Sequence, residues 1–187
     1  MIAELIRPFV SAVATGSVDI YNEFSLQHEL GLFLRTHQQN LKIQFERNVS
    51  YFFPGSASYT KREIDISAFS ENPRLLSFAV ELKYPRNGQH PEQMFSFCKD
   101  IAFCEELVAA GFSRSAFVVF AEDRLFYEGT PEGIFSFFRG GMPLHGRITK
   151  PTGKKDEFVS ISGHHTIRWN PVRGSLRYAV VEIERDR

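Results

Sequence analysis

The sequence predicts an α/β domain in which helices flank a mixed β-sheet, with a small antiparallel β extension at the C-terminal end. Three observations support this fold class. Residues 62–83 alternate apolar and polar side chains in two runs, and Asn72-Pro73 between them indicates the turn of a β-hairpin. A helical pattern over 91–110 separates this hairpin from a buried strand, which implies a crossover and two parallel strands. Strand patterns return between 157 and 184.

Composition indicates one globular domain. The chain has 187 residues, of which 43% are hydrophobic and 14% aromatic, so it can bury a sizeable core and is not disordered. We expect a single domain over 1–187, with its core at about 19–138 and a basic β extension at about 139–187. The net charge is zero, so the overall charge does not favour a nucleic-acid partner.

Two helices and a strand are expected before the hairpin. The apolar stripe of Ile2–Ala14 predicts an amphipathic helix that Gly16 ends. A second helical region covers Asp19–Gln38, and Ser25 could cap a fresh start within it. Leu41–Phe53 carries alternating apolar residues and predicts a long strand.

The elements expected after the hairpin complete the sheet and the extension. Pro91 suits the first turn of a helix, and Gly111 suits its end. The run after it is too apolar for an edge strand. The expected elements are the helix Pro91–Ala110, the strand Ser113–Phe120, the short helix Glu132–Phe138, and the strands Glu157–Ser162, His165–Trp169 and Leu176–Glu184.

The polar face of the hairpin gathers charged side chains. Because strand side chains alternate, Asp65 in the first strand and Glu81 and Lys83 in the second point away from the apolar face. Two carboxylates on adjacent strands can share a hard divalent cation through their oxygens. An ammonium group beside them can polarise a water molecule or hold a phosphate oxygen.

This pattern resembles that of the PD-(D/E)xK nuclease superfamily. Asp65 is followed, after a spacer of fifteen residues, by Glu81-Leu82-Lys83, although Ile64 stands where the motif has proline. The resemblance covers about residues 25–120 and implies a restriction-endonuclease-like fold and metal-dependent phosphodiester hydrolysis, with DNA and endonuclease action favoured. It implies that Asp65, Glu81 and the Leu82 carbonyl hold Mg²⁺ or Mn²⁺. Lys83 would then orient or deprotonate the nucleophile, or neutralise developing charge.

The resemblance also implies contributions from the flanking helices. Glu29 best matches a glutamate on the helix before the core sheet; the alternative is an ordinary surface glutamate. Gln93, four residues before Phe97, is similar to a glutamine that such enzymes carry near the metal, with Phe in place of Tyr. Asp100 is a rival to Gln93, and its alternative is a solvated carboxylate paired with Lys99 or Arg114.

A basic segment suggests where nucleic acid would bind. Residues 139–177 hold eight Lys and Arg against two acidic residues. A basic segment beside an acidic metal site suits a polyanionic substrate, although a solvated loop face would look the same. The predicted contacts are Arg86 in the loop after the hairpin, together with Lys150, Lys154, Lys155 and Arg173.

The remaining features limit the alternatives. Cys98 and Cys104 are expected to be reduced, half-buried thiols of a cytoplasmic protein, and no segment is apolar enough for a membrane span. The adjacent residues His164 and His165 would point to opposite faces of a strand, which disfavours a shared metal ion. The alternative function is a non-catalytic nucleic-acid-binding or partner-binding module on the same fold. A homodimer would be compatible with either function, but no interface is specified.

Overall fold

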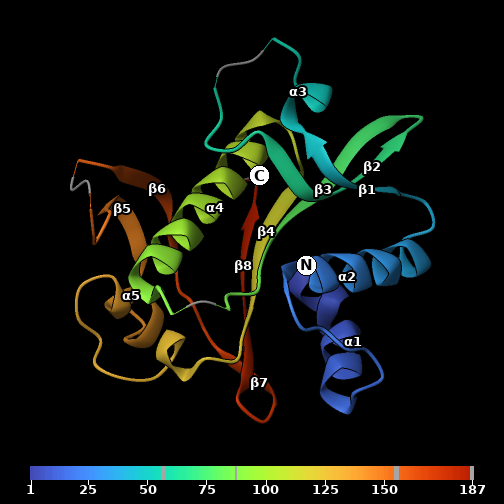
Figure 1. The fold of residues 1–187 in the computed structure, drawn as a ribbon. Coiled ribbons are helices and arrows are strands. Elements are labelled where there is room, and N and C mark those ends of the chain that lie inside the picture. Colours follow the sequence, from blue (N-terminus) through green and yellow to red (C-terminus); the bar gives the residue numbers. More distant parts are fainter. Residues whose placement is uncertain (56–57, 87, 154–155, 186–187) are drawn as a thin grey trace.

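A mixed six-stranded β-sheet runs through the centre of the protein (Figure 1). The computed structural model describes residues 1–55, 58–86, 88–153 and 156–185. The strand order is β1-β2-β3-β4-β8-β7, in which β3 and β4 are parallel and the other neighbouring pairs are antiparallel. The predicted α/β class and mixed sheet are therefore confirmed. The strands are β1 (Lys42–Asn48), β2 (Glu63–Glu71), β3 (Arg74–Lys83), β4 (Arg114–Ala121), β7 (Asn170–Arg173) and β8 (Leu176–Glu184).

Helices cover both faces of this sheet. On one face, α1 (Ile2–Thr15) and α2 (Glu23–His37) pack on a core that includes alternate residues of β3, such as Val80 and Leu82. On the other face, α4 packs against β4, and the short helices and a separate antiparallel hairpin lie beyond it (Figure 1). These elements are α4 (His90–Ala110), the 3₁₀-helix η1 (Arg124–Phe126), α5 (Phe135–Arg139), β5 (Leu144–Thr149) and β6 (Phe158–His165).

Helix α2 is positioned by its cap and by a glycine. Asn22 caps the helix, since its side chain accepts from the Ser25 amide at 2.7 Å while the Ser25 hydroxyl accepts from the Asn22 amide. The start is thus at Glu23, rather than in the Asp19 region that the sequence predicts. Gly31 lets the helix approach β1 closely, because a Cβ at this position would lie 2.0 Å from the Phe45 ring. The first turn of α2 lies at the end of the sheet where β2 begins and β3 ends.

Helix α4 makes the predicted crossover from β3 to the parallel strand β4. Proline stands in its first turn, and Gly111 ends it, as expected. Its buried residues include Phe97, Ile101 and Cys104, which pack on the sheet. Asp100 lies among them and is 2% exposed, so a carboxylate is carried into the interior on this helix.

The prediction of one strand over Leu41–Phe53 is wrong in its second half. Strand β1 ends at Asn48, and the short helix α3 (Val49–Phe52) follows. The Asn48 side chain accepts from the Ser50 amide at 2.9 Å, which starts the helix. Glu46 has a φ of 47°, a left-handed conformation that interrupts a regular strand.

The C-terminal region also differs from the prediction. The separate antiparallel extension is the hairpin β5–β6, and β5 falls in a stretch for which the sequence pattern predicts no strand. The strand expected over His165–Trp169 is absent from this described segment, since β6 ends at His165. Strands β7 and β8 do not belong to the extension, because β8 pairs with β4 from Arg177 to Glu184 and extends the main sheet.

Two expectations about the chain as a whole can be compared with the structure. Cys98 and Cys104 are both free, as predicted, but they are fully buried rather than half-buried. None of the helices in the described part of the chain has the length and apolarity that crossing a membrane requires.

Candidate active site

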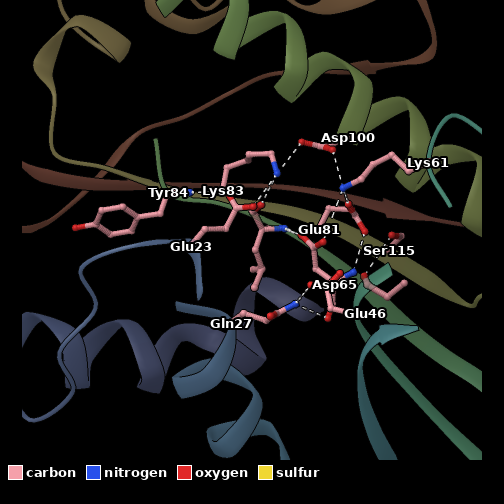
Figure 2. Close-up of polar contacts among 12 residues, drawn as sticks. Glu23, Gln27, Glu46, Lys61, Asp65, Glu81, Lys83, Tyr84, Asp100 and Ser115 are labelled. Carbon is pink, nitrogen blue, oxygen red and sulfur yellow. Dashed lines mark hydrogen bonds and ion pairs between the residues drawn. The ribbon is translucent and has the colours of Figure 1, made fainter. Parts of the chain in front are cut away.

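The site lies where the β2–β3 hairpin opens. Backbone pairing of the two strands continues to Ile66 and Val80. Beyond that pair, side chains replace the ladder: Asp65 Oδ2 accepts from the Leu82 amide at 2.7 Å, and Glu81 Oε1 accepts from the Asp65 amide at 3.2 Å (Figure 2). These bonds hold the two predicted carboxylates side by side on adjacent strands. Glu81 has no exposed surface, and Asp65 is 8% exposed.

A third carboxylate and a lysine join this pair. Asp100 reaches the hairpin from α4, and we call Asp65, Glu81 and Asp100 the acidic cluster (Figure 2). Lys61, which lies between α3 and β2, contacts all three members. Its Nζ donates to Glu81 Oε2, lies 3.0 Å from Asp100 Oδ1 and lies 3.8 Å from Asp65 Oδ1. The ammonium group of Lys61 therefore sits in the middle of the acidic cluster.

Lys83 reaches the same cluster from the other side. Its Nζ lies 3.5 Å from Asp100 Oδ2, and it donates to the Leu82 carbonyl at 2.9 Å. Glu23, in the first turn of α2, accepts from the same ammonium group at 3.2 Å. The structure thus brings Asp65, Glu81 and Lys83 into one connected group.

An open cleft lies beside this group and reaches Asp65. It has a volume of about 280 Å³. Gln27 on α2 links two parts of the cleft wall. Its Nε2 donates to the Asp65 carbonyl at 2.9 Å and to Glu46 Oε1 at 2.5 Å. Phe24 also lines the cleft and is 73% exposed. The lining residues are Glu23, Phe24, Gln27, Glu46, Asp65 and Leu82.

Burial and neighbouring charges act in opposite directions on the ionisable groups of the site. Burial raises the pKa of the Glu81 carboxyl well above its usual range, and Asp65 raises it further, while Lys61 opposes both. Burial also raises the pKa of Asp100, against the attraction of the two lysines. Burial alone would lower the pKa of Lys61 and of Lys83, but the surrounding carboxylates outweigh it, so both pKa values are raised. Both lysines are therefore ammonium groups near neutral pH.

Glu29 and Gln93, which the resemblance places near the metal, lie on α2 and α4. Glu29 follows Gln27 by two residues and therefore lies about 200° around α2 from it. It is not among the described residues that line the cleft, whereas Glu23 lines the cleft and accepts from Lys83. Gln93 precedes Asp100 by seven residues, on the same side of α4 but about 10 Å along its axis. Asp100, the rival, is the residue of α4 that contacts both lysines.

The predicted nucleic-acid contacts are spread over the surface. Arg86 is exposed in the loop after β3. Lys150 lies 2.8 Å from Glu157, which also contacts Lys99, and Arg173 lies 3.0 Å from Asp19, so both have carboxylate partners. Lys154 and Lys155 lie outside the described residues. The β5–β6 hairpin and strand β7 lie in separate parts of Figure 1, so the described strands of the basic segment are not all neighbours.

Several residues of the site were missed by the sequence analysis. Lys61 precedes the strand in a short polar segment and carries no periodic signal. Glu23 and Gln27 are spaced by four residues, which places them on one face of a helix, but this depends on where α2 starts. Asp100 is among the predicted candidates, as the rival to Gln93, and it lies three residues after Phe97 and four before Cys104, within the buried face of α4.

The three carboxylates of the acidic cluster surround the Lys61 nitrogen and are not positioned as the ligands of a metal ion. Within the described ranges, no group of three or more His, Cys, Asp or Glu side chains has an arrangement suited to a metal ion.

Comparisons of the chain with protein-family models, with curated proteins and with solved structures find no significant match. Function is therefore inferred from the residues of the site and their geometry.

Proposed function

We propose that this protein is a metal-dependent phosphodiester hydrolase of the PD-(D/E)xK type that acts on nucleic acid, with DNA favoured. The observation that carries the proposal is the open end of the β2–β3 hairpin. There Asp65 and Glu81 are held side by side by reciprocal hydrogen bonds, and Lys83 joins the same group through Asp100. The mixed sheet with a parallel β3–β4 pair and helices on both faces agrees with this type of nuclease.

The donor atoms suit Mg²⁺ or Mn²⁺. Carboxylate oxygens are the ligands that hard divalent cations prefer. Asp100 Oδ2 is buried and has no hydrogen-bond partner among the described atoms, and such an atom is costly unless a ligand satisfies it. We infer that Asp65 and Glu81 would hold the ion, with the Leu82 carbonyl as a further oxygen ligand. A bound Mg²⁺ lowers the pKa of a coordinated water molecule and stabilises negative charge on a phosphoryl group.

Lys83 is suited to stabilising charge. Because Asp100 and Glu23 raise its pKa, its side chain is protonated near neutral pH and donates hydrogen bonds. An ammonium group at the cleft can bind a non-bridging phosphate oxygen and orient the nucleophile. Because Lys83 is protonated, its predicted role in neutralising charge on the phosphate is favoured over its predicted role in removing a proton from the nucleophile. Gln27 is a positioning residue, since it fixes the backbone of Asp65.

The cleft also suits a nucleotide rather than a phosphate group alone. Phe24 exposes its ring beside Asp65 in the same cleft. Exposed aromatic rings stack on nucleic-acid bases, and each such contact contributes about 1–3 kcal/mol. A base of the substrate would therefore lie on Phe24 while its phosphate faces Lys83.

A second candidate is a nucleic-acid-binding module without catalysis. The observation that favours it is Lys61, whose ammonium group is a counter-ion for the acidic cluster without a metal ion. Such a protein would bind nucleic acid with a strong salt dependence but would be indifferent to divalent metal. Cleavage and metal dependence distinguish the two candidates.

The test is a cleavage assay with matched variants. Single-stranded DNA, double-stranded DNA and RNA are incubated with the protein and Mg²⁺ or Mn²⁺, with EDTA as the metal-free control. We expect the wild type to cut at least one of them, and Lys83→Met to lower the rate about 10²–10³-fold, the usual loss for one charge-stabilising donor. Lys42→Met is the control, because Lys42 pairs with Glu71 elsewhere on the sheet. Equal cutting by the wild type and by Lys83→Met would refute catalysis at this site.

A further inference from the structure

The side chain of Lys61 occupies the position that a cation would take in the acidic cluster. Its nitrogen is within 4 Å of an oxygen of each of the three carboxylates. Two of those carboxylates are almost completely buried, so they need a positive charge beside them in the folded protein. A divalent ion bound to the same oxygens would lie too close to the ammonium group for both to stay, since like charges repel strongly at this distance in a buried site.

Lys61 also has a place to which it can move. A second cavity, of about 380 Å³, lies against its segment and is lined by polar residues such as Asn48 and Ser50. Lys61 itself lines this cavity, and 28% of its side chain is exposed. A change of side-chain rotamer can therefore take the ammonium group out of the acidic cluster without refolding of β2.

We propose that Lys61 is an internal counter-ion that occupies the cation position of the acidic cluster and is displaced when a divalent metal ion binds. This inference rests on the proposed function, because it takes the acidic cluster as the metal site. It explains why the carboxylates are not arranged as a metal site while the lysine is present. It also explains the unsatisfied oxygen of Asp100, which faces Lys83 at 3.5 Å and becomes available to an incoming ion.

Lys61 then sets the metal affinity of the protein. Competition between two cations for one position is a thermodynamic coupling, and couplings between sites commonly change affinity about 5- to 150-fold. Lys61→Gln removes the competing charge and keeps a polar side chain, one atom shorter, that carries hydrogen-bond donors. We therefore expect Lys61→Gln to bind Mn²⁺ at least about fivefold more tightly than the wild type.

The test measures binding directly, by isothermal titration of Mn²⁺ into metal-free protein. The wild type should bind, Lys61→Gln should bind more tightly, and Lys42→Gln should match the wild type, because Lys42 pairs with a carboxylate away from the site. Equal or weaker binding by Lys61→Gln would overturn the displacement while leaving the proposed metal site intact. Failure of both the wild type and Lys61→Gln to bind Mn²⁺ would overturn the displacement and the proposed function together.

If Lys61→Gln does not fold without metal, a measurement on the wild type tests whether a metal ion displaces Lys61. Lys61 Nζ lies 5.9 Å from the centre of the Phe103 ring, so the end of the side chain should give nuclear Overhauser contacts to this ring. Saturating Mg²⁺ should abolish these contacts in protein with labelled lysine. Unchanged contacts at a Mg²⁺ concentration that saturates the protein would overturn the proposal.

Discussion

Replacing Asp65 by Asn and by Ala should separate the structural role of this side chain from its role at the metal. Asp65 Oδ2 accepts from the Leu82 amide at 2.7 Å, at a point where the backbone ladder of β2 and β3 has ended. Asn keeps an acceptor oxygen at this position but removes the charge. Ala removes both, so the buried Leu82 amide loses its partner.

The structure gives different expected magnitudes for the two variants. For Asp65→Ala we expect a loss of about 1.5–3 kcal/mol in the free energy of unfolding, the usual contribution of a hydrogen bond to a charged group. For Asp65→Asn two charge effects oppose each other. The attraction of Lys61 at 3.8 Å is lost, but so is the repulsion from Glu81, and the net change should stay within about 1 kcal/mol. Both variants should lose nuclease activity.

Urea denaturation in EDTA measures these differences. The chain has a single tryptophan, Trp169, which is half-buried and donates to the Phe138 carbonyl at 3.0 Å, so its fluorescence reports unfolding. Far-UV circular dichroism should give the same transition. If Asp65→Ala were as stable as Asp65→Asn, the carboxylate would contribute nothing as an acceptor for Leu82, and the account of how the hairpin opens would be wrong.

Three further predictions concern other parts of the protein. Burial alone would raise the pKa of Glu105, but hydrogen bonds from His165 and from two backbone amides of β6 outweigh it and lower the pKa. The contribution of Glu105 to stability is therefore present above its unfolded pKa of about 4.3 and is lost as the pH falls through the lower folded value. Thermal denaturation should show the difference between the wild type and Glu105→Gln shrinking on acidification; a constant difference would contradict this. Arg86→Ala should reduce the slope of log K for DNA binding against log salt by about 1, measured by fluorescence anisotropy in EDTA. Lys150→Ala should reduce that slope less, because the ammonium group already contacts a carboxylate; a larger effect than that of Arg86→Ala would show that the basic segment is the main binding surface.

The centre of the site could be predicted because it depends on a local rule. Alternation along two strands joined by a short turn places Asp65 opposite Glu81, and Lys83 one alternation further on, without reference to the rest of the fold. The crossover helix between β3 and β4 was predictable for a similar reason, since its length leaves few other connections.

The surroundings of the site depend on contacts between distant segments, which local patterns do not encode. Lys61 reaches Glu81 and Asp100 only because the segment before β2 turns toward α4. Glu23 rather than Glu29 contacts Lys83, because the cap at Asn22 fixes where α2 begins and therefore which of its residues face Lys83. The addition of β8 to the main sheet is likewise a pairing between strands more than fifty residues apart, and strand patterning predicts a strand but not its neighbour.

Crystals soaked with Mn²⁺ give the most direct test of the site, because anomalous scattering locates the ion independently of any activity. The account predicts a peak bridging Asp65 and Glu81, with Lys61 Nζ withdrawn from the acidic cluster and Lys83 still beside it. A fully soaked crystal with no peak at these carboxylates, and with Lys61 still between them, would contradict the account.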